Sequence, residues 1–180
     1  SYMSGMEKIG DSLFASSSNS IYEIELSGTS ATVSTLSLSG IDNSTSVNFD
    51  KMTSSGNSLY LSGSSTNSPM YRVNLVEGGS GVTTGETTII KPSFTAASYY
   101  NTGTEVQLSY VGGLTTDGTA LYVADGSHKL IRKIDLTTSN ISTLAGKLEN
   151  YADGTGVNGE FLHPDKMVRI GTDLYVVDDS

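Results

Sequence analysis

A five-residue pattern, Gly-x-x-Leu-aromatic, recurs four times in this 180-residue chain and constrains its fold more than any other feature. The copies begin at Gly10, Gly56, Gly118 and Gly171, which places them 46, 62 and 53 residues apart. Four copies of so specific a pattern rarely arise by chance. Such regular self-similarity is typical of repeat proteins, in which each copy marks one supersecondary unit that stacks against the next.

Each copy lies among short runs of strand-forming residues. One short segment precedes every copy, and two further runs follow each of the three complete copies, as Ile131–Ile134 and Ile141–Leu144 follow the third. Alternating apolar and polar residues over such short runs indicate β-strands. The glycine of each copy supplies the positive φ that a tight hairpin requires. The pattern therefore predicts four antiparallel strands in each unit of ~50 residues.

The composition also favours β structure. The chain has 29 Ser, 21 Thr and 20 Gly, which leaves few helix formers and argues against a helical bundle or a coiled coil. The segments Leu121–Ala124 and Leu174–Val177 are apolar on both faces, whereas a sheet with one wet face would alternate. Both faces are covered when four-stranded sheets stack around a central axis. We therefore predict an all-β fold, a β-propeller of four-stranded antiparallel blades.

The last third of the chain, residues 114–180, resembles the NHL-repeat β-propeller family in its bacterial form. His128 and Leu130 take the positions that give the family its name, and Ser127 stands where the family often has Asn. The segments that carry the resemblance are Thr119–Asp125, His128–Asp135, Ser142–Gly146, Tyr151–Gly156, Phe161 and Pro164. The resemblance implies an NHL-type propeller. The first two units share only the Gly-x-x-Leu-aromatic core, so their assignment rests on periodicity.

The repeat predicts one propeller segment, residues 1–180, of about three and a half blades. The predicted blades are residues 6–49, 50–112 and 113–164, and residues 165–180 begin a fourth. Propellers typically have four to eight blades. Two interpretations therefore stay open: either a longer chain supplies the missing blades, or a second copy completes the ring.

Charge and cysteine usage exclude several classes of partner. The net charge of −9 would repel a phosphate backbone, so nucleic acid is a poor partner. No run of 18 apolar residues exists, so we expect no membrane insertion, and the first residues show no signal-peptide pattern. The absence of Cys excludes disulfides and thiolate metal sites. Because a chain rich in Ser and Thr without Cys is common among exported bacterial proteins, we expect a secreted or cell-surface location.

No catalytic residue and no metal site are predicted. The two histidines, His128 and His163, are too few for a three-histidine zinc site, and no Gly-x-Ser-x-Gly elbow occurs. The acidic loop Asp153–Glu160 is a candidate for calcium, but Val157 stands where an EF-hand loop needs an oxygen ligand. Turn geometry is the preferred interpretation, so no cofactor is expected and calcium is the alternative.

Five residues are candidates for ligand binding. The second unit is the longest, and its excess, around Pro92–Tyr110, is rich in tyrosine. Long loops on rigid scaffolds often carry recognition, and Tyr offers a large contact area with a polar tip. The candidates are Tyr99, Tyr100 and Tyr110, with His128 and Lys129 from the third unit. The competing interpretations are an insertion that packs over a neighbouring blade, and a histidine that bonds its own hairpin backbone.

These observations favour a non-catalytic interaction scaffold that binds a protein, a peptide or a glycan through its loops and rim. The alternative is a propeller enzyme, a lactonase-like hydrolase or an amidating lyase, with a metal in the axial channel. The first strands of the blades would line that channel. They carry an acidic residue followed by a lysine in three units, at Glu7–Lys8, Asp50–Lys51 and Asp165–Lys166. Adjacent lysines favour ion pairing over a metal cage.

Overall fold

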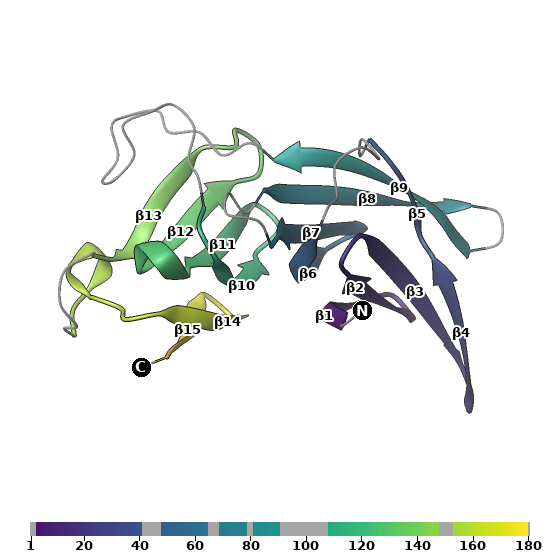
Figure 1. The fold of residues 1–180 in the computed structure, drawn as a ribbon, viewed down its shortest axis with the longest axis horizontal. Helices are drawn as coiled ribbons and strands as arrows, with labels where there is room; N and C mark the ends of the chain where they lie inside the picture. Colours follow the sequence, from purple (N-terminus) through teal and green to yellow (C-terminus); the bar gives the residue numbers. More distant parts are fainter. Residues whose placement is uncertain are drawn as a thin grey trace. The chain divides into compact units, whose positions relative to one another are not determined.

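The computed structural model describes residues 3–40, 48–64, 69–78, 81–90, 108–147 and 153–179 (Figure 1). It divides into two compact units, Ser1–Ser64 with Met70–Ile89 and Ser65–Pro69 with Ile90–Ser180. Apart from two short 3-10 turns, every described regular element is a β-strand, which confirms the all-β prediction. Among these residues, no helix has the length and apolar character that a bilayer crossing requires.

The first unit holds two sheets. In the first sheet the strands run in the order β1-β2-β3-β4, all antiparallel. Their bounds are Met3–Ile9 (β1), Ser12–Ser17 (β2), Ser20–Ser27 (β3) and Ser30–Thr35 (β4). The second sheet has the order β5-β9-β8-β7-β6. Its strands are Ser37–Ser39 (β5), Phe49–Ser55 (β6), Ser58–Gly63 (β7), Met70–Gly78 (β8) and Gly81–Ile90 (β9).

The second sheet has one strand more than the sequence predicted. Strand β5 runs parallel to β9, with Ser37 opposite Thr84. Gly85 of β9 makes room for this added strand, because a Cβ there would lie 3.0 Å from Cδ2 of Leu38 in β5. The sequence did not predict β5 because a parallel pairing between distant residues leaves no turn signal.

The second unit holds one complete sheet and one hairpin. The complete sheet has the order β10-β11-β12-β13, and β14 pairs with β15 alone. The strands are Val111–Thr116 (β10), Ala120–Asp125 (β11), Leu130–Asp135 (β12), Ile141–Gly146 (β13), Pro164–Ile170 (β14) and Asp173–Asp178 (β15). The 3-10 turns are Gly126–His128 (η1) and Gly156–Asn158 (η2). The fourth copy of the repeat therefore forms the predicted hairpin.

The four repeat glycines all form the turn between the first two strands of their sheets. Their φ angles are +58° at Gly10, +54° at Gly56, +88° at Gly118 and +62° at Gly171. An L side chain is strained in this left-handed region, whereas glycine is not. The predicted role of these glycines is thus confirmed at every copy.

Within each unit the first strands of successive sheets lie side by side, and glycine lets them approach. In the first unit β1 lies beside β6, and a Cβ on Gly5 would be 2.8 Å from Cβ of Met52. In the second unit β10 lies beside β14, and a Cβ on Gly113 would be 2.5 Å from the backbone oxygen of Asp165. Both units therefore pair their sheets in the same way.

The core of the first unit forms between its two sheets. Phe14 and Ile21 of the first sheet and Leu59 and Leu61 of the second are fully buried in one apolar cluster. In the second unit both faces of β11 are covered, because Val123 and Ala124 point to opposite faces and both are 0% exposed. The predicted burial of this strand on both faces is confirmed.

Candidate functional site

An aspartate at the last position of the second strand recurs in the two sheets of the second unit. The carboxylate of Asp125 accepts the backbone N–H of Ser109 at 3.1 Å. That of Asp178, 53 positions later, accepts the N–H groups of Leu162 and His163 at 3.0 and 2.8 Å. Each aspartate thus ties the segment that leads into its own sheet to the end of the second strand.

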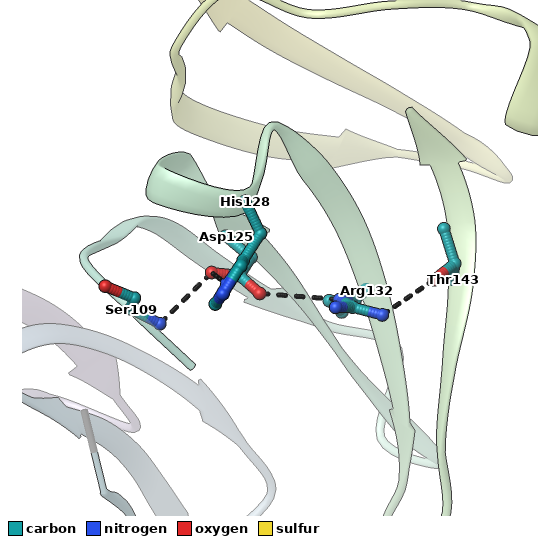
Figure 2. Close-up of polar contacts among 5 residues, drawn as sticks. All are labelled: Ser109, Asp125, His128, Arg132 and Thr143. Carbon is teal, nitrogen blue, oxygen red and sulfur yellow. Dashed lines mark hydrogen bonds and ion pairs between the residues drawn. The ribbon is translucent and has the colours of Figure 1, made fainter. Parts of the chain in front are cut away.

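Asp125 also belongs to a buried polar cluster that crosses three strands (Figure 2). Arg132 Nε donates to Asp125 Oδ2 at 3.4 Å, and Arg132 Nη1 donates to Oγ1 of Thr143 at 2.7 Å. Both charged side chains are 0% exposed. Burial lowers the pKa of Arg132, and the carboxylate of Asp125 opposes this shift by favouring the charged guanidinium. Ion pairing and hydrogen bonding compensate the two charges, which fixes β11, β12 and β13 relative to one another.

His128 is positioned by the same carboxylate. Its Nδ1 lies 2.8 Å from Asp125 Oδ1, and 27% of its side chain is exposed (Figure 2). The interpretation of His128 as a residue bonded to its own hairpin backbone is therefore corrected: the partner is a side chain, and η1 takes the place of a simple hairpin turn. The cluster holds the ring in one orientation at the edge of the sheet.

Tyr110 and Lys129 flank the same turn in strained backbone conformations. Both have positive φ, 52° and 58°, although neither is glycine. Lys129 donates its N–H to the backbone oxygen of Gly126 at 3.2 Å. The ring of Tyr110 lies over Gly126, where a Cβ would be 2.9 Å from Cδ1, and the side chain is 56% exposed. The structure thus brings together three predicted residues, Tyr110, His128 and Lys129, which we call the η1 surface. The other two, Tyr99 and Tyr100, lie outside the described residues.

The predicted ion pairing on the first strands is found at one of three positions. Lys51 Nζ lies 3.1 Å from Asp50 Oδ1. The carboxylate of Glu7 instead accepts the hydroxyl of Ser54 on β6 at 3.1 Å. Burial raises the pKa of Glu7, although the serine hydrogen bond opposes the shift. In the described part of the chain, no three His, Cys, Asp or Glu side chains are grouped closely enough to hold a metal ion.

The acidic loop considered for calcium forms a compact turn around η2. Gly154 packs against the backbone of Asn158, where a Cβ would lie 2.5 Å from the oxygen. Glu160 lies at 3.8 Å from Lys147 Nζ and is 10% exposed. This geometry agrees with the preferred interpretation of the loop as a turn.

The roles of Asp125, Arg132 and Thr143 were not predicted from the sequence. A signal for the aspartate was present, because Asp125 and Asp178 both stand four residues after the leucine of their repeat copy. No such signal marked Arg132, which lies in an alternating run that reads as an ordinary strand. Its burial depends on what covers that face of the sheet.

No protein-family model and no curated protein sequence matches this chain. Its fold is similar to that of a structural genomics protein of unknown function from Bacteroides thetaiotaomicron, with a TM-score of 0.67 and 17% identity, over 98% of this chain and 44% of that one. An auxiliary nutrient binding protein from the same organism gives a TM-score of 0.59 and 17% identity, over 91% and 42%.

A third similar structure is apo AztD from Citrobacter koseri, with a TM-score of 0.54 and 13% identity, over 98% of this chain and 41% of that one. The chain therefore spans less than half the length of each of these proteins. At such low identities the likeness shows a shared fold, built here from two four-stranded antiparallel sheets, one five-stranded sheet and one hairpin among the described residues.

Proposed function

We propose that this chain is a segment of an NHL-type β-propeller that acts as a non-catalytic binding module, exported from a bacterial cell. The propeller assignment is supported by features that repeat along the chain. These are the left-handed turn glycines, the paired first strands of each unit, and the equivalent hydrogen bonds of Gly126 to Tyr110 and of Asp179 to His163. Stacked, similar sheets are the geometry from which propellers are built.

Two exposed apolar sheet faces support continuation of the same stack. Met6, Leu26 and Val33 share one face of the first sheet and are each more than half exposed. Tyr175 and Val177 share one face of the β14–β15 hairpin and are also more than half exposed. Exposed apolar area of this kind marks surfaces that pack against another element. Further blades, from a longer chain or a second copy, would cover both faces.

The observation that carries the binding proposal is the strained backbone of the η1 surface. Glycine would adopt the positive φ of positions 110 and 129 without strain, yet the chain has Tyr and Lys there. Strain of ~1–3 kcal/mol per residue persists where surrounding structure enforces it, and it clusters at ligand sites. An exposed tyrosine beside a held histidine and a lysine suits a peptide, protein or glycan partner. The similarity to a nutrient binding protein supports a binding role.

The test is to replace the strained residues by glycine. Tyr110→Gly and Lys129→Gly should leave stability unchanged or raise it by up to about 1 kcal/mol, because the strain is relieved. Both should weaken capture of the labelled chain by peptide and glycan arrays at least tenfold. Ser139→Gly is the matched control, because Ser139 also has a positive φ, +58°, in the turn between β12 and β13. Binding that is equal in all three variants would contradict the proposal.

A further inference from the structure

A separate cavity lies at the end of the β10–β13 sheet, next to the η1 surface. Its volume is about 220 Å³, which holds about seven water molecules at ~30 Å³ each. It is lined by Leu130, Thr143, Gly146, Lys147, Val157 and Asn158. These residues come from the start of β12, from β13 and the residue that follows it, and from η2. The cavity is smaller than the sites that hold drug-sized ligands, so it suits a small molecule.

Gly146 is one reason that the cavity can form. Its φ is +102°, and a Cβ there would lie 2.4 Å from the backbone oxygen of Lys129. The glycine therefore lets the end of β13 turn closely over the start of β12. Any side chain at this position would disrupt the wall between the η1 surface and the cavity.

The cavity wall includes Thr143, whose hydroxyl can both accept and donate a hydrogen bond. Its oxygen accepts a hydrogen bond from Arg132 Nη1 at 2.7 Å, so the fully buried guanidinium occupies one lone pair of this oxygen. A threonine hydroxyl can also donate one proton, and within the described residues no hydrogen bond uses that proton. Accepting from a charged donor strengthens the donation of the same hydroxyl. The site therefore favours a ligand with an acceptor oxygen.

The other lining groups define the rest of the ligand. Lys147 adds an ammonium group, whose Nζ lies 3.8 Å from an oxygen of the Glu160 carboxylate. The amide of Asn158 can donate as well. None of the described lining residues is acidic or aromatic, and Leu130 and Val157 offer aliphatic surface. A lining that combines hydrogen-bond donors with aliphatic side chains matches an anionic head on a short apolar body.

We propose that this cavity binds a small amphipathic carboxylate, whose carboxylate accepts from Thr143 and Lys147 while its chain packs on Leu130 and Val157. The net charge of −9 opposes any anion at long range, but salt at about 150 mM screens charges beyond ~8 Å. The local donors then decide the preference.

The test is isothermal titration of the chain with hexanoate, with the uncharged isostere hexanamide and with glucose, in physiological salt. We expect saturable 1:1 binding of hexanoate, and binding of hexanamide at least tenfold weaker. Lys147→Met and Thr143→Val should each weaken hexanoate binding at least tenfold, whereas Thr143→Ser should restore it. Lys166→Met and Ser142→Ala, at exposed positions of β14 and β13, are the matched controls.

Two substitutions of opposite charge at Val157 keep the test decisive if Thr143→Val fails to fold. Val157 lines the cavity and is 54% exposed, so Val157→Asp and Val157→Lys should both fold. The first should abolish hexanoate binding and the second should strengthen it. Equal affinity for hexanamide, preference for glucose, or no binding of hexanoate would overturn the proposal. Tyr110→Gly should leave hexanoate binding unchanged, so failure here is distinguishable from failure of the η1 surface.

Discussion

The third and fourth copies of the repeat form the same hairpin in two different surroundings. Strands β11 and β15 are equivalent, 53 positions apart, and both end in an aspartate that accepts backbone N–H groups. Ala124 in β11 is 0% exposed, because its face of the sheet packs beside β14. Its equivalent, Val177 in β15, is 57% exposed. The comparison teaches that the hairpin depends on local turn and hydrogen-bond chemistry, whereas burial of the second face requires a neighbouring sheet.

A second difference concerns the polar groups around the aspartate. Asp125 holds both His128 and the buried Arg132, and the cluster extends to Thr143 on β13 (Figure 2). Asp178 holds only backbone groups among the described residues. The same aspartate therefore has a structural role in both copies, and in the third copy it also contacts the side chain of His128 at the η1 surface.

The largest expected effect separates these two aspartates. Asp125→Ala should lower the free energy of unfolding by about 3–5 kcal/mol, because it leaves the Arg132 guanidinium buried without its carboxylate. Asp178→Ala should cost about 1–2 kcal/mol, since only hydrogen bonds to backbone N–H groups are lost. Urea denaturation followed by circular dichroism measures both. Equal losses of stability in the two variants would show that the ion pair adds nothing. The double variant Asp125→Ala with Arg132→Met should recover part of the stability that Asp125→Ala loses.

An intermediate effect on stability should distinguish the covered face of β11 from the exposed face of β15. Ala124→Val should destabilise the chain by about 1–3 kcal/mol, because the extra methyl groups have no room between β11 and β14. Val177→Ala, the reverse exchange at the equivalent position, should change stability by less than about 0.5 kcal/mol. The same denaturation assay applies. A large cost at Val177 would mean that its face is covered in this chain, and would contradict the comparison.

The smallest effect concerns the turns that precede the two strands. Burial tends to raise the pKa of Asp117, but hydrogen bonds from Thr119, Ala120 and Tyr122 outweigh it and hold the pKa well below its usual range. A carboxyl with a depressed folded pKa stabilises the protein above its unfolded pKa of 3.8, and this stabilisation is lost as the pH falls. The fourth copy has Ile170 at this position and lacks the effect.

The stability difference between the chain and Asp117→Asn should therefore shrink as the pH is lowered from about 6 to about 3. Solvent screening keeps the change below about 1 kcal/mol. Ile170→Asn, at the equivalent turn, is the control and should show no pH dependence of its own. A difference that stays constant with pH would refute a role for the Asp117 charge.

Much of the fold was predictable from the sequence because its signals are local. Alternating runs and left-handed glycines predicted 14 of the 15 described strands and the four turns between first and second strands. Strand β5 was not predicted, because its partner β9 pairs with it in parallel across a long separation. The η1 surface was predicted only in part: Tyr110, His128 and Lys129 were named. The ion pair between Asp125, which contacts His128, and Arg132 was not predicted.

By itself, the sequence determined the strands, the hairpin turns and the repeat, because these depend on φ preferences and on the period of apolar residues. Only the tertiary structure decided which copies are covered on both faces, because that depends on which sheets pack together. It also decided that Arg132 is buried, that Asp125 serves three partners, and that Gly146 lets β13 close a cavity beside the η1 surface. These features arise from residues brought together by strand pairing, and no local pattern in the chain records them.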